Sequence, residues 1–98
     1  MDKGALYENF VASELLKKGE IIQYWRTKSK AEVDFVLEKE GKVIPIEVKS
    51  NLNKPIIERS LHSFIEKYSP SQSVILSEKL WTKKKEVIFR PIFWVGRV

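Results

Sequence analysis

Residues 31–50, AEVDFVLEKEGKVIPIEVKS, constrain the fold of this chain more than any other stretch. Two runs, VDFVL and VIPIEV, alternate apolar and polar side chains, which is the pattern of strands with one buried face. The polar pair Glu40-Gly41 lies between the two runs and is typical of a turn. The stretch therefore predicts a β-hairpin whose loop has two or four residues centred on Glu40-Gly41.

A hairpin of this kind fixes which side chains lie opposite one another, because side chains alternate between the two faces of a sheet. On one face the predicted facing pairs are all apolar: Val33 with Val48, Phe35 with Ile46, and Leu37 with Ile44. On the other face Asp34 lies opposite Glu47, and Glu32 lies opposite Lys49. Pro45 removes a hydrogen-bond donor from the second strand, so we expect a bulge or an unpaired edge near it.

The facing carboxylates of Asp34 and Glu47 require an explanation. Directly opposed residues have Cβ atoms about 4.5–5.5 Å apart, so two ionised carboxylates at this distance repel each other. The repulsion is removed if one carboxylate is protonated or if a cation lies between them. A divalent cation accounts for the pair most simply, with Lys49 on the same face as Glu47.

A third carboxylate comes from the N-terminal part of the chain. The sequence predicts a helix over residues 3–18, with Asp2 as its N-cap and Gly19 just beyond its end. Burial of an unpaired charge costs several kcal/mol, so a glutamate within the apolar stripe of a helix needs a partner. Glu8 is such a residue, because it lies in the middle of the arc formed by Ala5, Val11, Ala12, Leu15 and Leu16.

The remaining elements predict an α/β domain. We expect strands over residues 21–27 and 73–77, a helix from Pro55 to Tyr68, and a last strand over residues 86–95 that Pro91 interrupts. The predicted order is αβββαβ followed by one more strand. This order predicts a single domain over residues 1–98, with a mixed β-sheet flanked by helices.

Composition excludes several kinds of site. The chain has no cysteine and one histidine, so it offers neither thiolate zinc sites nor multi-histidine metal centres, and any metal needs oxygen ligands. The net charge of +5 suits a polyanionic partner but is also common on proteins that bind none. We find neither an apolar run of about 18 residues nor a signal-peptide pattern. We therefore expect a cytoplasmic protein without a membrane partner.

The candidate site residues form a recognisable chemical set. Glu8, Asp34 and Glu47 are hard oxygen donors of the kind that hold Mg²⁺ or Mn²⁺, and the backbone carbonyl of Val48 is a candidate further ligand. A metal held this way lowers the pKa of a bound water and stabilises charge that develops on a phosphoryl oxygen. Lys49 would orient the attacking water or offset the same charge. The set predicts phosphodiester hydrolysis.

The triplet Glu47-Val48-Lys49, the upstream Asp34, the helical Glu8 and the αβββαβ order resemble the PD-(D/E)XK nuclease superfamily. This resemblance implies a restriction-endonuclease-like core, with Asp34, Glu47 and Lys49 as the signature residues and Glu8 as an additional acidic residue. It also implies a Mg²⁺- or Mn²⁺-dependent endonuclease that acts on nucleic acid, DNA rather than RNA. Val33 stands where the superfamily motif has the proline that names it.

A narrower resemblance covers nearly the whole chain. WRTKSKAEVDFVLEKEGKVIPIEVKS, with ALYENFVASELLKKG before it, is similar to the nuclease-like domain at the carboxyl end of many prokaryotic AAA-type ATPases. This resemblance implies an AAA-type ATPase domain as a partner. These residues contain no ATPase motif, so we interpret the chain as a domain that can belong to a longer ATPase-containing protein.

The charged candidates also have structural interpretations. Glu47 and Lys49 can form an ion pair on a solvated sheet face. Arg26, Lys28 and Lys30, just before the hairpin, either contact the phosphates of a nucleic acid or form a solvated turn.

Three other features are interpreted as structural. We expect the run from Lys83 to Lys85 to be a solvated loop, and His62 to be a helix-surface or packing residue. Tryptophans are more often core or interface residues than platforms for bases, and this is our expectation for Trp25, Trp81 and Trp94.

Two other classes of function remain open. One is a nuclease fold that no longer cleaves and instead binds nucleic acid or serves as an accessory module of an AAA-type ATPase. The other is a structural dimerisation domain. A homodimer is expected if the apolar segment over residues 87–95 is exposed, whereas in a monomer the same segment would complete the sheet or dock on an ATPase domain.

Overall fold

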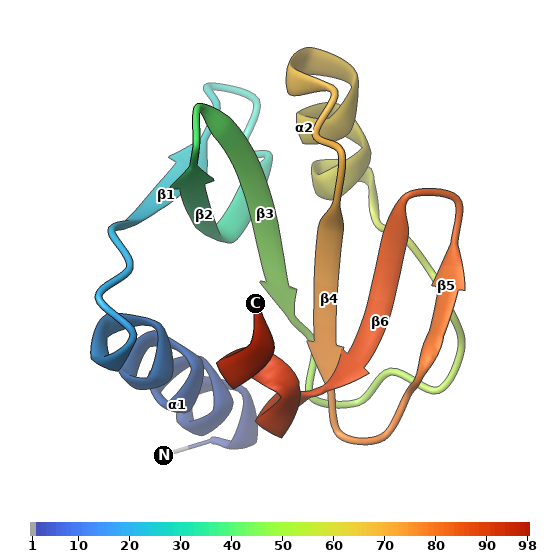
Figure 1. The fold of residues 1–98 in the computed structure, drawn as a ribbon. Helices are drawn as coiled ribbons and strands as arrows, with labels where there is room; N and C mark the ends of the chain where they lie inside the picture. The colour runs from blue at the N-terminus through green and yellow to red at the C-terminus, as the bar shows by residue number, and fades with distance from the viewer. Residues whose placement is uncertain (1) are drawn as a thin grey trace.

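The computed structural model describes residues 2–98, which form a mixed β-sheet with helices on both faces (Figure 1). The helices are α1 (Lys3–Lys17), α2 (Arg59–Tyr68) and the 3₁₀ helix η1 (Ile92–Arg97). The strands are β1 (Ile22–Arg26), β2 (Glu32–Lys39), β3 (Lys42–Val48), β4 (Ser73–Ser77), β5 (Thr82–Lys84) and β6 (Val87–Pro91). The predicted mixed α/β class is confirmed.

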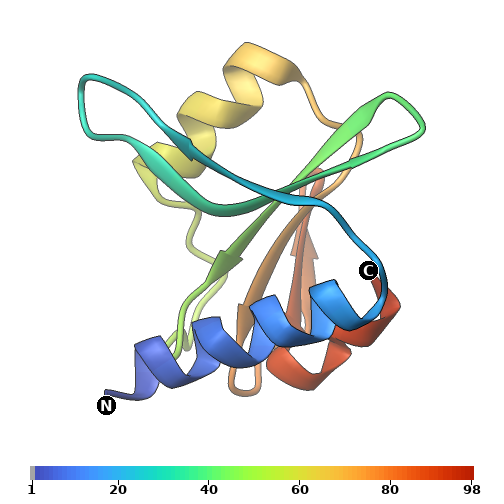
Figure 2. The same cartoon turned by 90° about the vertical axis from the view of Figure 1, so that its left-hand side faces the viewer.

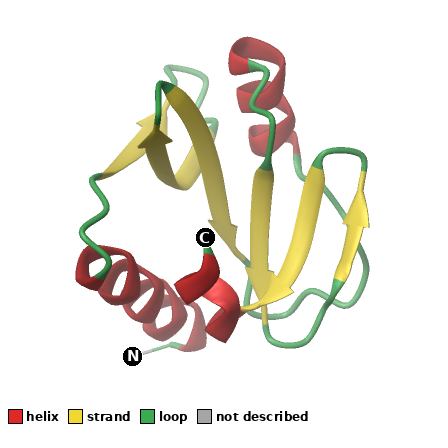
Figure 3. Ribbon diagram, viewed as in Figure 1, coloured by secondary structure: helices red, strands yellow, loops and turns green. Residues whose placement is uncertain are grey.

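The six strands lie in the order β1-β2-β3-β4-β6-β5. β1, β2 and β3 form an antiparallel meander, β3, β4 and β6 are parallel, and β5 is antiparallel to β6 (Figure 3). The crossover from β3 to β4 passes through α2. Within residues 2–98, no helix is both long enough and apolar enough to cross a membrane.

Two apolar clusters hold the layers together, one on each face of the sheet. Figure 2 shows α1 and η1 on one side of the sheet and α2 on the other. On the first face, α1 and η1 contribute Val11, Leu15 and Val95, which are fully buried against the central strands. On the second face, α2 contributes Leu61 and Phe64, which are 1% exposed. Both faces of β4 are buried, which explains why SVILS lacks the polar alternation of a surface strand.

The N-terminal helix begins where the sequence predicts. The Asp2 side chain accepts a hydrogen bond from the backbone N–H of Ala5 at 2.7 Å, as expected of an N-cap. The predicted apolar stripe is narrower than expected, because Leu16 is 60% exposed while Val11 and Leu15 are buried.

The β2–β3 hairpin has the predicted pairing near its turn. Phe35 pairs with Ile46, Leu37 pairs with Ile44, and Lys39 pairs with Lys42. Its two-residue loop has positive φ at both central positions, 53° at Glu40 and 77° at Gly41, which is the signature of a type I′ turn.

β3 pairs with β4 only from Ile46 onward, so the part of β3 that contains Pro45 is paired with β2 alone. This arrangement matches the unpaired edge expected near Pro45, whose missing N–H needs no acceptor there.

Three predicted boundaries were wrong. The second helix begins at Arg59 rather than at Pro55, because Glu58 is still extended and Ile57 packs as a non-helical residue against the α2-side cluster. The predicted last strand ends at Pro91, after which the chain turns into η1. Within residues 82–84 the chain forms the short edge strand β5, where a solvated loop was expected over Lys83 to Lys85.

The structure also places the residues that were interpreted as structural. His62 is exposed on α2, as expected. Trp25 packs against Phe64, with 5.3 Å between ring centroids. Trp81 is 60% exposed, and its ring stacks on the guanidinium of Arg90 at 4.3 Å.

The strained turn provides a test of the hairpin geometry. A left-handed conformation costs a non-glycine residue about 1–2 kcal/mol, and asparagine tolerates it better than glutamate. We therefore expect Glu40→Asn to raise the free energy of unfolding by about 0.5–1 kcal/mol. Gly41→Ala should lower it by about 1–2 kcal/mol, although a Cβ added there meets open space among residues 2–98. Urea unfolding of both variants measures these changes, and equal midpoints for all three proteins would contradict the assigned turn.

Candidate functional site

A β-bulge in β2 organises the candidate site. The pairs that flank it are Gln23 with Val36 and Trp25 with Val33. Between these pairs, Tyr24 of β1 lies opposite two residues of β2, Asp34 and Phe35. Bulges of this kind redirect side chains and are frequent next to active sites.

Because of the bulge, the predicted position of Val33 was wrong. Val33 was expected to share an apolar face with Phe35 and Leu37, but it packs in the α2-side cluster while Phe35 and Leu37 pack on the α1 side. The extra residue in β2 breaks the alternation of side chains at this point. As a result, Asp34 and Phe35 both lie toward α1.

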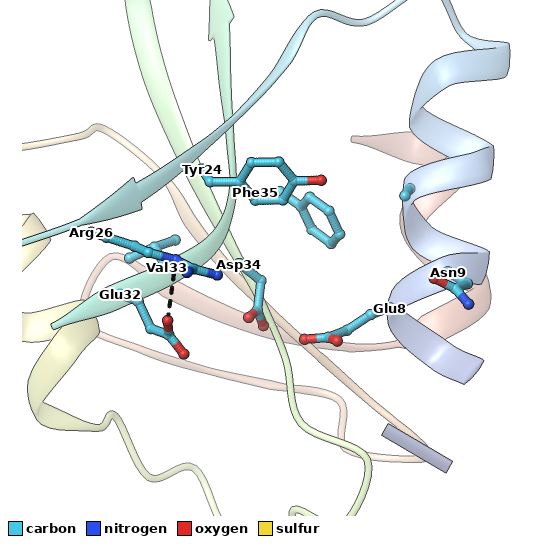
Figure 4. Close-up of a pocket in the computed structure, with 9 residues that line it drawn as sticks. Glu8, Asn9, Tyr24, Arg26, Glu32, Val33, Asp34 and Phe35 are labelled. Carbon is cyan, nitrogen blue, oxygen red and sulfur yellow. Dashed lines mark ion pairs between the residues drawn. The ribbon is translucent and has the colours of Figure 1, made fainter. Parts of the chain in front are cut away.

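Asp34 meets Glu8 of α1 on this side of the sheet. In Figure 4 the two carboxylates point toward each other from β2 and α1. Partial burial of Glu8 raises its pKa, and the charge of Asp34 and a hydrogen bond with its side chain raise it further. The side chain that Glu8 meets is thus a second carboxylate, and repulsion between two neighbouring carboxylates is relieved when one of them is protonated or a cation lies between them.

Asp34 also contacts Glu47, through the backbone rather than side chain to side chain. The backbone N–H of Asp34 donates to Glu47 Oε1 at 3.1 Å, and the backbone N–H of Val48 donates to Asp34 Oδ2 at 2.8 Å. These two bonds take over where the β2–β3 register ends at Phe35 and Ile46. The hairpin therefore brings Asp34 and Glu47 together as expected, but by reciprocal side-chain-to-backbone contacts at a point where the strands separate.

Glu47 is buried, with 6% of its surface exposed. Burial raises the pKa of Glu47 to about 7, and the negative charges of Asp34 and Glu58 act in the same direction. The charge of Lys49 and the Asp34 N–H oppose this rise without cancelling it. Glu47 is therefore a carboxyl group whose charge is poorly compensated by the protein alone.

Lys49 lies next to Glu47 and is held by a residue that the sequence analysis missed. Its Nζ is 3.8 Å from Glu47 Oε2 and 3.0 Å from Glu58 Oε1. Burial lowers the pKa of Lys49, but the hydrogen bond to Glu58 and the charges of Glu47 and Glu58 outweigh it and raise the pKa overall. Lys49 is thus a fixed positive charge at the site.

Glu58 is the residue that precedes α2, in the N-cap position. The sequence could have indicated it only through the correct start of this helix. The predicted helix began at Pro55, which placed Glu58 on a first helical turn instead of at the helix entrance.

Two adjoining hollows open on the site, and Asp34 and Glu32 line both of them. The first lies toward α1 and includes Glu8, Tyr24 and Arg26 (Figure 4). The second lies toward α2, and its lining includes Lys30, Glu47, Lys49, Glu58 and Ser60.

The three basic candidates differ in position. Arg26 lines the first hollow, where its Nε is 3.4 Å from Glu32 Oε2. Lys30 is exposed and lines the second hollow. Lys28 is exposed in the turn between β1 and β2. Arg26 and Lys30 therefore flank the acidic residues, and Lys28 lies beyond them.

The acidic residues are linked in pairs rather than gathered around one point. Asp34 interacts with Glu8 on one side and with Glu47 on the other, and its charge contributes to the raised pKa of each. Across residues 2–98, no group of three His, Cys, Asp or Glu side chains is close enough to hold a metal ion in this arrangement. Asp34 is the residue that the two pairs share.

Fold and site together define a mixed α/β domain with an acidic cluster at the point where two strands separate. The family described as Domain of unknown function (DUF4143) matches residues 3–92, and the chain belongs to this family. The matched range includes Glu8, Asp34, Glu47, Lys49 and Glu58. No curated protein and no solved structure matches the chain.

The raised pKa of Glu47 predicts how stability depends on pH. In the folded protein the pKa is about 7, compared with an ordinary value of 4.5, so folding favours the protonated form. Below about pH 4.5 Glu47 is protonated in both the folded and the unfolded protein and does not lower the free energy of unfolding. As the pH rises from there through about 7, the free energy of unfolding falls. One pKa unit corresponds to about 1.4 kcal/mol, so the loss is up to about 3 kcal/mol. Glu47→Gln should remove this dependence, because the amide mimics the protonated acid.

The measurement is denaturant unfolding at pH 5 and pH 8 in a metal chelator. Relative to wild type, Glu47→Gln should gain stability at pH 8 and show little change at pH 5. Glu38→Gln is the matched control, because Glu38 is an exposed carboxylate on the same hairpin. Parallel pH profiles for wild type and Glu47→Gln would show that Glu47 does not titrate as described.

Proposed function

We propose that the domain is a metal-dependent nuclease that hydrolyses phosphodiester bonds, in DNA rather than RNA. The observation that carries this proposal is the contact between Asp34 and the Glu47-Val48-Lys49 segment where β2 and β3 separate. The observed order of α1, β1, β2, β3, α2 and β4 supports a restriction-endonuclease-like αβββαβ core.

The donor types suit a divalent cation, but no three acidic side chains among residues 2–98 are close enough together to hold one as they stand, so binding would require them to converge. Asp34, Glu47 and Glu8 supply carboxylate oxygens, and the carbonyl of Val48 lies on the same strand end. Burial, and after it the negative charge of Asp34, raises the pKa of both Glu47 and Glu8, and a bound Mg²⁺ or Mn²⁺ would stabilise their ionised forms. When bound, such a metal supplies Lewis-acid activation of water and charge stabilisation at the phosphoryl group.

The protein's own groups have distinct tasks in this proposal. Asp34 and Glu47 bind the cation, and their hydrogen bonds to backbone N–H groups fix the directions of their remaining lone pairs. Glu8 acts as an outer or shared ligand from α1. Lys49, held by Glu58, would place a positive charge near the phosphoryl oxygens, where negative charge develops in the pentacoordinate transition state.

Nucleic acid would be bound mainly through its phosphates. Arg26 and Lys30 flank the acidic hollows, so they can bring a phosphate toward Asp34 and Glu47. Lys28 extends the same basic edge. No helix presents a row of basic side chains to a groove among residues 2–98, so we expect binding that depends on the backbone rather than on base sequence.

A second candidate function is a nuclease-fold module without cleavage activity, accessory to an AAA-type ATPase. The observation that favours it is the backbone bonding of Asp34 and Glu47, because carboxylates used to join strands serve a structural role without any metal. The domain would then bind nucleic acid or the ATPase.

The sequence of residues 87–95 suggests an apolar surface for a homodimer, but in the structure little of this segment is exposed. Most of this segment is used inside the domain, where Val87, Phe89 and Val95 are buried. Phe93 is 75% exposed and remains a candidate contact with a second copy or with an ATPase domain.

The deciding experiment is a cleavage assay on single-stranded, double-stranded and branched DNA with Mg²⁺ or Mn²⁺, together with calorimetry of metal binding. Asp34→Asn and Glu47→Gln should weaken metal binding and abolish cleavage. Lys49→Met should retain metal binding but reduce turnover by at least about 100-fold, because it removes charge stabilisation from the transition state. Glu8→Gln should give an intermediate loss.

Glu38→Gln is again the control, and it should cleave like wild type. If wild type cleaves none of the substrates and gives no heat with divalent metal, with or without DNA, the nuclease proposal fails and the accessory module becomes the better account. Metal binding without cleavage in the presence of DNA would also favour the accessory module.

Salt dependence tests the nucleic-acid contacts. Affinity for DNA should fall steeply between about 50 and 200 mM salt, because phosphate contacts release counterions. A Lys28→Ala/Lys30→Ala double variant should flatten the slope of log affinity against log salt by up to about 2, roughly one for each phosphate contact. An unchanged slope would show that these lysines belong to a solvated turn.

A further inference from the structure

Tyr24 is an exposed aromatic residue at the rim of the acidic hollow. It is 68% exposed and lies on the edge strand β1, where it lines the same hollow as Asp34 and Glu8 (Figure 4). A large side chain at position 24 is not needed to attach β1 to the core, because the neighbouring Trp25 does so. The Trp25 ring packs against Phe64 of α2, with 5.3 Å between ring centroids.

The bulge that redirects Asp34 also positions Tyr24. Tyr24 lies opposite both Asp34 and Phe35, so one irregularity of the backbone brings the aromatic ring and the carboxylate together. The Phe35 ring lies 6.0 Å from the Tyr24 ring and is itself 4% exposed. A buried ring therefore supports the exposed one, which limits the conformational freedom that Tyr24 loses when a ligand stacks on it.

Arg26 adds a phosphate-binding group beside this ring. It lies two residues along β1, lines the same hollow, and pairs with Glu32 at 3.4 Å. An aromatic face next to a guanidinium, with carboxylates behind them, can bind the base and the phosphate of one nucleotide.

We propose that Tyr24 is a base-stacking residue and that the substrate is single-stranded or frayed DNA. In a duplex, each base is stacked between its neighbours and its face is not available to a protein ring. An unpaired base offers its face, and stacking on an aromatic side chain tolerates any base sequence. The proposal rests on the nuclease function and names its substrate class: DNA with unpaired nucleotides next to the scissile phosphate.

The test compares Tyr24→Ala, Tyr24→Phe and Tyr24→Trp in fluorescence anisotropy and in cleavage kinetics. The probes are a labelled single strand, the duplex of the same sequence, and a single strand of abasic nucleotides, each with Mg²⁺ or Mn²⁺. Tyr24→Ala should weaken binding of the single strand by about 5- to 100-fold, since one stacked base contributes this much. Tyr24→Phe and Tyr24→Trp keep an aromatic face and should stay within about threefold of wild type.

Binding of the duplex and of the abasic strand should be the same for wild type and Tyr24→Ala, because neither probe offers a free base. Trp81→Ala is the matched control: Trp81 is an exposed aromatic residue that precedes β5, at the opposite edge of the sheet. Thermal unfolding of every variant shows whether the fold is retained.

Two results would overturn the proposal while the nuclease function stands. One is that Tyr24→Ala binds the single strand as tightly as wild type does. The other is that Tyr24→Ala loses the same factor of affinity for all three probes. A different result, in which wild type neither binds nor cleaves any probe, would remove the nuclease function and the stacking role together.

Discussion

The two hydrogen bonds that join Asp34 to the Glu47-Val48 segment determine the form of the site. The β2–β3 ladder ends at Phe35 and Ile46, and beyond this pair the carboxylates of Asp34 and Glu47 accept the backbone N–H groups that a ladder would have used. Because side chains bridge the gap, the strands can separate without leaving these donors unpaired. The separation opens the hollows, and the bridging side chains become their acidic lining.

This arrangement concentrates negative charge that the described residues compensate only in part. Lys49 lies 3.8 Å from Glu47, and it is shared with Glu58. Burying carboxylates beside one another destabilises the folded state, and sites that keep such an arrangement commonly use it to bind a proton or a cation. Under the proposed function the acidic cluster binds a cation, and its bonds to backbone N–H groups hold the strands in either case.

Local patterns predicted the hairpin and the proximity of its carboxylates, because both depend on neighbouring residues. Glu40-Gly41 specifies the turn, and the turn specifies the register as far as Phe35 and Ile46. The bulge could not be predicted in this way, since it depends on how β1 pairs across Tyr24. Glu58 was missed for a similar reason: a non-periodic segment separates it from Lys49, and only the tertiary fold brings them together.

Ile46 is the residue at which β3 changes from one partner strand to the other. It pairs with Phe35 of β2 on one side and with Val74 of β4 on the other, whereas β3 before it pairs with β2 and β3 after it pairs with β4. The sheet is thus two three-stranded halves joined through a short overlap of one strand (Figure 1). Asp34 belongs to the first half, whereas Glu47 pairs with Ile75 of β4 in the second, so the hydrogen bonds between Asp34 and the Glu47-Val48 segment tie the two halves together next to this overlap.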